Sequence, residues 1–425
     1  MKSLFKLISL LTALTLVLTA CGSSSTSANI AKSNQRRITT PNAPADDVSA
    51  LVDGNNAFAL DLYQSLRSQG GNLIYSPFSI SLALAMTYAG ARNATESQMA
   101  DTMRFLPQDK LHTAFNALDL TLTAEHKAES KDQNPLQLNI ANAVWAEQTY
   151  SFQQNFLDTI ALNYGAGINL ADFINQYEPT RKEINGWVSG KTNDKINDLI
   201  PEGALNPNTR MVLVNAIYFK ADWLEQFDAN STSDYAFHLL DGSTINVPTM
   251  FNGMSIPYMQ GNNYQAVELA YAGNTAAMDI IVPDEGKFEE FESAFDSATL
   301  NNITNNMQPA SVAFGLPKFT FSSDFGLSDQ LAGLGMPDAF DADKADFSGM
   351  TGKPDLFISD VIHKAFVAVD EKGTEAAAAT AVLMETTSAR MNNVNLIVDR
   401  PFIFIIRDLE TGQILFAGRV LNPAQ

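Results

Sequence analysis

The chain has 425 residues, 45% of them hydrophobic and 17% charged, which is typical of a globular protein with a large core. This composition excludes a chain that is disordered throughout. The formal net charge of −20 argues against a surface that binds nucleic acid.

The first residues have the features of a secretory signal. Lys2 and Lys6 accompany an apolar run, residues 7–18, that is too short to span a bilayer. The only cysteine follows in Leu18-Thr-Ala-Cys21, which resembles the bacterial lipobox, where the thiol receives a diacylglyceryl group. The alternative is an ordinary secretory signal followed by an unrelated cysteine.

The lipobox resemblance implies that residues 1–20 are a signal peptide and that lipid on Cys21 anchors the protein to the bacterial envelope. Several acyl chains on one residue give firm anchoring, at about 0.8 kcal/mol per buried methylene. Gly22 follows the cysteine where an aspartate would favour the inner membrane, so the outer membrane is the expected location. The protein would then be periplasmic or surface-exposed.

Residues 21–46 are rich in Ser, Thr, Asn, Pro and Ala, which predicts a lipidated, flexible tether. No internal repeat or linker divides residues 47–425. Helical patterns dominate the first part of this region and strand patterns the rest, which predicts one α+β domain.

The predicted elements follow in chain order. Periodic apolar residues predict helices over residues 48–67, 80–91, 152–164, 181–200 and 288–295. Alternating or continuous apolar runs predict strands over residues 72–76, 136–147, 211–219, 312–321 and 357–370, with further strands between 244 and 283. Residues 401–406 and 414–420, joined by a turn at 409–412, predict an antiparallel hairpin buried on both faces.

Two polar residues interrupt strands that should be buried. Asn215 lies in a continuous apolar run, and a buried amide without hydrogen-bond partners costs about 1–3 kcal/mol. His363 lies in another apolar strand, where a buried, hydrogen-bonded histidine is favoured over a catalytic base. Both are therefore expected to make polar contacts inside the molecule.

The sequence lacks the usual patterns of a catalytic or metal site. The histidines are His112, His126, His238 and His363, and they form no His-Glu-x-x-His motif or other metal-spaced pair. There is no Gly-x-Ser-x-Gly elbow and no glycine loop of the phosphate-binding type. The many carboxylates are interpreted as a solvated surface. We therefore expect neither an enzyme nor a cofactor or metal.

A long run of small residues, 369–391, separates two strand-like segments. Successive side chains of a strand point to opposite faces, so residues of equal parity share a face. Glu375 and Glu385 are both odd-numbered, whereas the even positions near the start of the run are uncharged: Thr374, Ala376, Ala378 and Thr380. This sorting predicts a strand that can enter a sheet. The alternative is a solvated alanine-rich loop or helix.

Within this run, residues 371–380 resemble the hinge of an inhibitory serpin, and residues 396–406 resemble the C-terminal signature of that family. Further matches to the family lie at residues 72–79, 213–223, 316–318 and 363–365. Together the matches extend over residues 47–425 in the family's order.

The resemblance implies the serpin fold, an α+β architecture of three β-sheets and eight or nine helices. A reactive-centre loop, about residues 371–395, would lie above a large five-stranded sheet. A target protease would cleave this loop as an acyl-enzyme, and the cut loop would enter the sheet and carry the protease about 50 Å, at ~3.3 Å per residue. The implied function is monomeric suicide inhibition of serine proteases, with cysteine proteases as a second class. The alternative is a non-inhibitory serpin that acts as a binding or chaperone module.

The resemblance also assigns expected roles to single residues. Ser76, Ser79, Asn215 and His363 match a buried polar cluster beneath the sheet that opens. Trp223 matches the tryptophan where the loop enters, and Glu371 and Lys318 match a pair that ties the hinge to a neighbouring strand. Gly373 would let the backbone turn as insertion begins.

Two counts place the cleaved bond differently. Seventeen residues counted from Glu371 end at Thr387, so the bond Thr387–Ser388 would suit elastase-like or subtilisin-like proteases. Counting back from Pro401 gives Arg390–Met391, which would suit trypsin-like proteases. We favour the first count, because the length on the hinge side sets how far the protease is carried.

Overall fold

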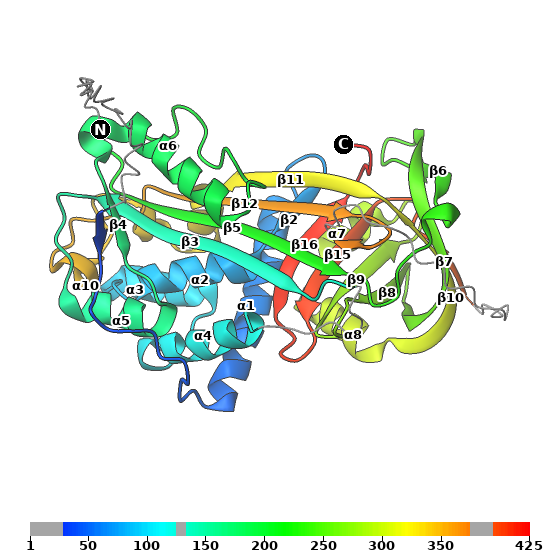
Figure 1. The fold of residues 1–425 in the computed structure, drawn as a ribbon, viewed down its shortest axis with the longest axis horizontal. Helices are drawn as coiled ribbons and strands as arrows, with labels where there is room; N and C mark the ends of the chain where they lie inside the picture. The colour runs from blue at the N-terminus through cyan, green and yellow to red at the C-terminus, as the bar shows by residue number, and fades with distance from the viewer. Residues whose placement is uncertain (1–28, 125–132, 375–393) are drawn as a thin grey trace, which may run out of the picture.

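The computed structural model describes residues 29–124, 133–374 and 394–425. Helices cover both faces of a large sheet at one end of the molecule, and a second sheet network forms the other end (Figure 1). The α-helices in the described ranges are α1 (Ala45–Leu66), α2 (Pro77–Tyr88), α3 (Asn93–Met103), α4 (Gln108–Leu122), α5 (Gln154–Tyr164), α6 (Phe173–Lys191), α7 (Phe288–Ala294), α8 (Ser297–Asn306), α9 (Ser328–Leu334) and α10 (Ser348–Thr351). Two short 3₁₀ helices are η1 (Ala229–Ser231) and η2 (Pro337–Phe340).

The large sheet has seven strands where the sequence led us to expect five. Its order is β1 (Asn29–Ala31), β4 (Ile168–Ala171), β3 (Gln137–Glu147), β5 (Met211–Asp222), β13 (Gly373–Thr374), β12 (Asp360–Val369) and β11 (Phe319–Gly326). The two additional strands are short. β1 comes from the segment before the expected domain, and β13 comes from the expected hinge.

The second network has nine strands. Its order is β14 (Val394–Ile397), β10 (Gln308–Pro317), β7 (Thr244–Gln260), β8 (Tyr264–Ala270), β9 (Ala276–Pro283), β15 (Phe402–Asp408), β16 (Ile414–Val420) and β2 (Leu73–Tyr75), with β6 (Ser233–His238) beside β7. The 17-residue strand β7 pairs with β6 and β10 along most of its length and with β8 at its end. It therefore joins two parts that, with the large sheet, correspond to the three expected sheets.

Helix α2 lies under the large sheet because its sequence suits a fully buried helix. Pro77 occupies the first turn, and Ser76 caps the helix by accepting a hydrogen bond from the backbone N–H of Ser79. All twelve residues of α2 are buried. The continuous apolar strand β5 passes over this helix, and α6 covers the opposite face of the sheet (Figure 1).

Residues 29–38 pack against the domain, so the expectation of a flexible tether over 21–46 is wrong for this part. β1 pairs antiparallel with β4, and the N–H of Ile38 donates to the carbonyl of Leu162 at 2.9 Å. Arg37 forms an ion pair with Asp119 on α4 at 2.6 Å and donates to the Asn116 side chain at 2.8 Å. We call residues 29–38 the N-terminal strap.

The predicted helix over 181–200 is shifted in the structure. α6 runs from Phe173 to Lys191, and the backbone of Asn193 and Asp194 then takes positive φ values of 52° and 59°. Asparagine and aspartate tolerate this conformation better than other side chains, and it ends a helix. The apolar residues after 191 pack as a loop, which apolar spacing alone does not distinguish from a helix.

Candidate loop-insertion site

A buried polar cluster joins α2 to the centre of the large sheet. Asn215 on β5 lies directly beside His363 on β12, and these side chains are hydrogen-bonded. The Asn215 amide also donates to Ser79 Oγ at 2.7 Å. The backbone N–H of Ser76 donates to His363 Nε2 at 3.0 Å. The structure thus brings together all four residues that the sequence placed in one cluster.

The cluster has a further member that the sequence analysis did not identify. Asn142 lies opposite Asn215 on β3, and its Oδ1 accepts hydrogen bonds from Asn215 and from Ser79. Its own amide donates to the Ser79 carbonyl at 3.0 Å. Asn142 interrupts the apolar positions of β3, as Asn215 interrupts the apolar run of β5. This interruption could have identified Asn142 from the sequence.

The contacts of His363 define its protonation state. Nε2 accepts from a backbone N–H and therefore carries no proton, so Nδ1 holds the proton and donates to Asn215 Oδ1. Burial lowers the pKa of His363 from 6.5 to about 3. The histidine is neutral and its two ring nitrogens are both occupied, which suits a structural contact rather than a proton-transfer role.

The two central strands of the large sheet separate toward one end. β5 and β12 are parallel and pair from Val212 and Asp360 as far as Ile217 and Ala365. Beyond that point β13 lies between them and is antiparallel to both. The sheet is therefore already open at this end, with two hinge residues in the opening.

Gly373 makes a close backbone contact in this opening. A Cβ at this position would lie 2.1 Å from the carbonyl oxygen of Ala221 and 2.6 Å from Cα of Asp222. Only glycine fits beside β5 at this distance. The expectation that Gly373 serves a backbone turn was incomplete, because close packing against β5 also requires glycine.

Thr374 is the only hinge side chain beyond Gly373 that the structure describes, and it points into the core. It is 1% exposed, and its hydroxyl lies 2.7 Å from Tyr271 Oη. Tyr271 stacks on Trp223, with ring centroids 4.6 Å apart. Tyr271 is a contact of the hinge that sequence reasoning missed, because it is distant in the chain and belongs to none of the recognised motifs.

Trp223 and Glu371 hold the start of the hinge. Trp223 donates through Nε1 to the carbonyl of Asp370 at 3.0 Å and through its backbone N–H to the carbonyl of Lys372 at 2.7 Å. The Glu371 carboxylate accepts from Lys318 Nζ and from Thr232 Oγ1, each at 2.7 Å. Burial is the largest single influence and raises the pKa of Glu371, but these two hydrogen bonds, a backbone hydrogen bond and the charge of Lys318 together lower it below its usual value.

Several predicted site residues lie outside the described residues. They are Cys21, Ala376, Ala378, Thr380, Thr387, Ser388, Arg390 and Met391. Within the described ranges, no group of three or more His, Cys, Asp or Glu side chains could hold a metal ion. None of the helices in those ranges is long and apolar enough to cross a membrane.

The fold and this site define a class of protein whose central sheet is open at one end and holds two residues of the following segment there. Residues 53–423 match the sequence profile of the family described as Serpin (serine protease inhibitor). The chain belongs to the serpin family. This confirms the α+β serpin fold that the hinge and C-terminal motifs indicated.

Relatives match over most of their length. An uncharacterised serpin-like protein of Thermococcus kodakarensis is 40% identical over 88% of this chain and 86% of its own. The leukocyte elastase inhibitor of Xenopus laevis is 39% identical over 86% of this chain and 97% of its own. The native structure of tengpin, a thermophilic serpin, has 31% identity and a TM-score of 0.80, covering 92% of this chain and 97% of that one. Membership in this family and kinship with elastase inhibitors indicate protease inhibition in general.

Proposed function

We propose that the protein is a suicide inhibitor of serine endopeptidases, with cysteine endopeptidases as a second class. The observation that carries this proposal is the hinge strand β13, which lies antiparallel between the parallel strands β5 and β12. Inserting the rest of the loop would replace one parallel ladder by two antiparallel ladders, which are slightly more stable per residue. The protease would be held as an acyl-enzyme while this free energy distorts it.

The register of β13 supports a position for the inserted loop. Gly373 and Thr374 pair with Asp222 and Ala221, and Thr374 also pairs with Val369. If both ladders continued residue by residue after insertion, Thr380 would lie opposite Asn215 on β5 and opposite His363 on β12. The hydroxyl of Thr380 would then point toward the polar cluster, because residues directly opposite each other share a face. A small hydroxyl residue there can replace hydrogen bonds that the opening strands lose.

A non-inhibitory serpin that acts as a binding or chaperone module is the alternative. The residues of the hinge favour inhibition. Thr374 is already buried, and the following even positions, 376 and 378, are alanines that a sheet can accept. A charged or bulky residue at these positions would favour the alternative, since its burial would oppose insertion.

The direct test is incubation with pancreatic elastase, neutrophil elastase, subtilisin and trypsin, followed by denaturing electrophoresis. We expect a covalent complex with at least one of them. Thr374→Arg should be cleaved without forming the complex, because the charge would have to enter the core beside Tyr271. Glu375→Arg is the matched control, since parity assigns residue 375 to the solvent face, and it should still form the complex. No complex across the panel, or equal trapping by Thr374→Arg, contradicts the mechanism.

The proposed reactive bond is Thr387–Ser388, with Arg390–Met391 as the second candidate. The first predicts elastase-like or subtilisin-like targets, and the second predicts trypsin-like targets. Mass spectrometry of the peptide released on complex formation distinguishes them, because the peptide begins at Ser388 in one case and at Met391 in the other. A different first residue contradicts both assignments.

We also propose that the inhibitor is anchored to a bacterial envelope membrane through lipid on Cys21, with the outer membrane favoured. The support is the signal-like sequence before Cys21 and the glycine after it. Growth with an alkyne-bearing fatty acid should label the wild type and leave Cys21→Ser unlabelled. Labelling of both proteins would contradict lipid attachment at this cysteine.

A further inference from the structure

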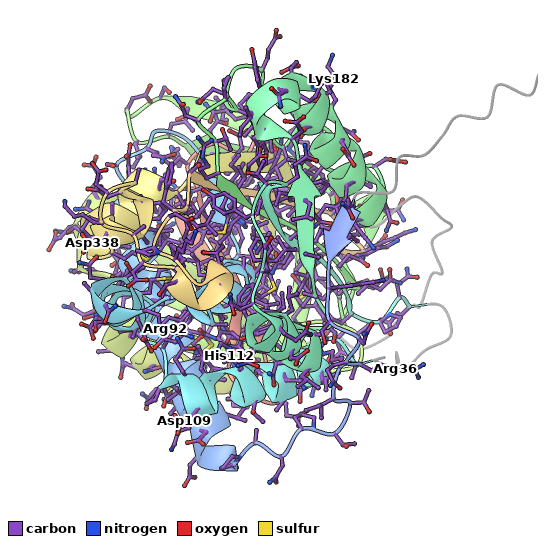
Figure 2. The ribbon with its side chains drawn as sticks, turned by 90° about the vertical axis from the view of Figure 1, so that its left-hand side faces the viewer. Arg36, Arg92, Asp109, His112, Lys182 and Asp338 are labelled. Atoms are coloured by element: carbon purple, nitrogen blue, oxygen red, sulfur yellow. The ribbon has the colours of Figure 1, made fainter. Side chains whose placement is uncertain are left out.

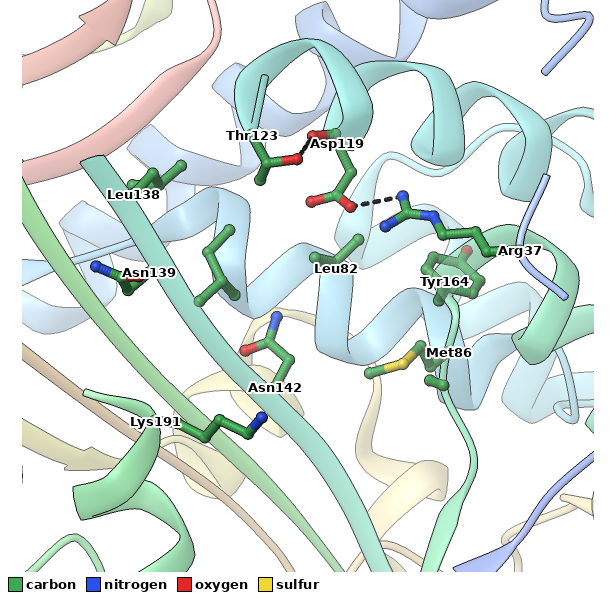
Figure 3. A pocket seen from close by; sticks show the side chains of 12 residues that line it. Arg37, Leu82, Met86, Asp119, Thr123, Leu138, Asn139, Asn142, Tyr164 and Lys191 are labelled. Atoms are coloured by element: carbon green, nitrogen blue, oxygen red, sulfur yellow. Dashed lines mark hydrogen bonds and ion pairs between the residues drawn. The ribbon is translucent and has the colours of Figure 1, made fainter. Parts of the chain in front are cut away.

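A pocket of about 390 Å³ opens beside β3 and borders the buried polar cluster at Asn142 (Figure 3). Its floor is apolar and comes from Leu82 and Met86 on α2. Leu138 and Ile140 on β3 form one wall, and both side chains are half-buried. This volume lies within the range of about 300–1,000 Å³ that is usual for small-molecule sites.

Two cationic side chains extend toward the pocket from opposite sides (Figure 3). Arg37 comes from the N-terminal strap and is paired with Asp119, which also lines the pocket. Lys191 comes from the end of α6 and makes no ion pair or hydrogen bond with any described residue. Lys191 therefore leaves a local excess of one positive charge in a chain whose net charge is −20. This charge favours an anionic ligand.

The edge of β3 adds polar groups to the same pocket. β4 pairs with β3 only from Val144 to Glu147, so on this side the part of β3 before Val144 has no strand partner among the described strands. Asn139 also lines the pocket, with its side chain on the opposite face of β3 from Asn142 (Figure 3), and this side chain makes no hydrogen bond with a described residue. Unpaired backbone groups and a free amide provide hydrogen-bond donors for an anion, as in other small-molecule sites with a few convergent polar groups.

We propose that this pocket binds a medium-chain aliphatic carboxylate. The carboxylate contacts Lys191 and the polar edge of β3, and the chain lies on Leu82, Met86 and Ile140. Such a ligand combines one negative charge with an apolar chain, which can contact the half-buried Leu138 and Ile140 and the small exposed parts of Leu82 and Met86. Nothing in the loop-insertion mechanism uses these groups, so the pocket is a second site.

The ligand would also be coupled to the sheet. Asn142 lines the pocket and is hydrogen-bonded to Ser79 and Asn215 in the buried cluster. A ligand held by α2 and β3 together opposes movement of β3 over α2, and it therefore favours the intact over the loop-inserted form. This coupling rests on the proposed function, whereas the site itself does not.

The site is tested by calorimetric titration of the full chain with sodium decanoate, with decanol, decylammonium and hexanoate as comparison ligands. We expect one decanoate per chain. Decanol and decylammonium should bind more weakly, and hexanoate should bind at least about tenfold more weakly because it buries fewer methylenes. Absence of decanoate binding, or equal binding of decanol, overturns the proposal.

Lys191→Gln should weaken decanoate binding about fivefold, as expected for loss of a partly exposed charge contact. Lys182→Gln is the matched control on the same helix. Lys182 is exposed at the rim of the molecule and does not line the pocket (Figure 2). An equal effect of the two variants, or none from Lys191→Gln, overturns the assignment of the anion to Lys191.

The coupling is tested with protein cleaved in the loop. By linkage, a ligand that favours the intact form must bind the loop-inserted form more weakly. Weaker decanoate binding after cleavage supports the coupling, and equal binding overturns the coupling while leaving the site in place. Cleaved protein that gains no heat resistance indicates instead that the loop does not insert, which is a failure of the proposed function.

Discussion

At the scale of single residues, the site depends on buried residues whose neighbours restrict which side chain can occupy the position. His363 and Asn215 have their hydrogen-bonding groups fixed by neighbours from three elements. Gly373 has no room for a Cβ. The sequence indicated the first two as polar interruptions of apolar strands, but the close contact of Gly373 depends on the distance to β5, which no local pattern contains.

Replacing His363 tests the protonation state that its contacts define. The pKa of this histidine falls from 6.5 to about 3 on folding, so the unfolded chain binds a proton that the folded chain excludes. Stability is therefore complete above about pH 6.5 and is lost as the pH falls toward 3, by up to about 1.4 kcal/mol per pH unit for one proton. The free energy of unfolding is measured by urea titration at several pH values between 3 and 6.5. It should change less with pH for His363→Gln than for the wild type. The same pH dependence of the unfolding free energy in both proteins would contradict a buried, neutral His363.

Gly373→Ala tests the close approach of the hinge to β5. The added methyl group overlaps the Ala221 carbonyl, so the hinge must move out of the sheet, at a cost of about 1–3 kcal/mol. We expect the domain to fold but more inhibitor to be cleaved per protease trapped, by roughly tenfold. Gly70→Ala is the matched control, because Gly70 is exposed, has open space around it and does not have a positive φ. An unchanged ratio for Gly373→Ala would show that β13 does not aid insertion.

At the scale of elements, the N-terminal strap changes how the domain begins. Its sequence is polar and contains few residues to bury, so composition predicts a tether. In the structure it gains stability from partners far along the chain, namely the edge of β4 and the helices α4 and α5. Composition cannot show that an uncovered sheet edge is available to pair with a short polar segment.

Arg37→Met should destabilise the native protein because it removes the ion pair with Asp119 and the hydrogen bond to Asn116. The Asp119 side chain is only 11% exposed and would lose its cationic partner, so we expect a loss of about 1–3 kcal/mol. Arg36→Met is the control, because the neighbouring Arg36 lies exposed at the rim of the molecule (Figure 2). Thermal unfolding of both variants measures the difference. Equal midpoints would show that the strap adds no stability through Arg37.

At the scale of the whole molecule, the seven-stranded sheet has room for a further strand between β5 and β12. β5 and β12 are parallel neighbours within a sheet in which β11, β13 and β3 pair antiparallel with them. Strand β13 of the hinge already lies between β5 and β12 at one end of the sheet. Insertion of the rest of the loop between β5 and β12 would not change the order of the other strands.

Cleavage within the loop should therefore raise the thermal stability of the protein. About ten further residues of the loop can pair before β5 ends at Met211, and each net hydrogen bond contributes about 0.5–1.5 kcal/mol. A gain of several kcal/mol corresponds to a rise of roughly 5 °C or more in the unfolding midpoint of a domain of this size. Scanning calorimetry of intact and cleaved protein measures the rise, and Thr374→Arg cleaved in the same way should show less of it. Equal midpoints for intact and cleaved wild type would contradict loop insertion.

The sequence by itself determined the family, the main strands, and the polar pair Asn215 and His363, because apolar periodicity and contiguous motifs are local properties of the chain. It did not determine α3, whose apolar pattern is weak, nor α4, nor the end of α6. Only the tertiary structure placed Asn142 and Tyr271 at the site, attached the N-terminal strap and formed the pocket at the edge of β3. Each of these depends on contacts between residues far apart in the chain, and such contacts are set by how the sheets and helices pack.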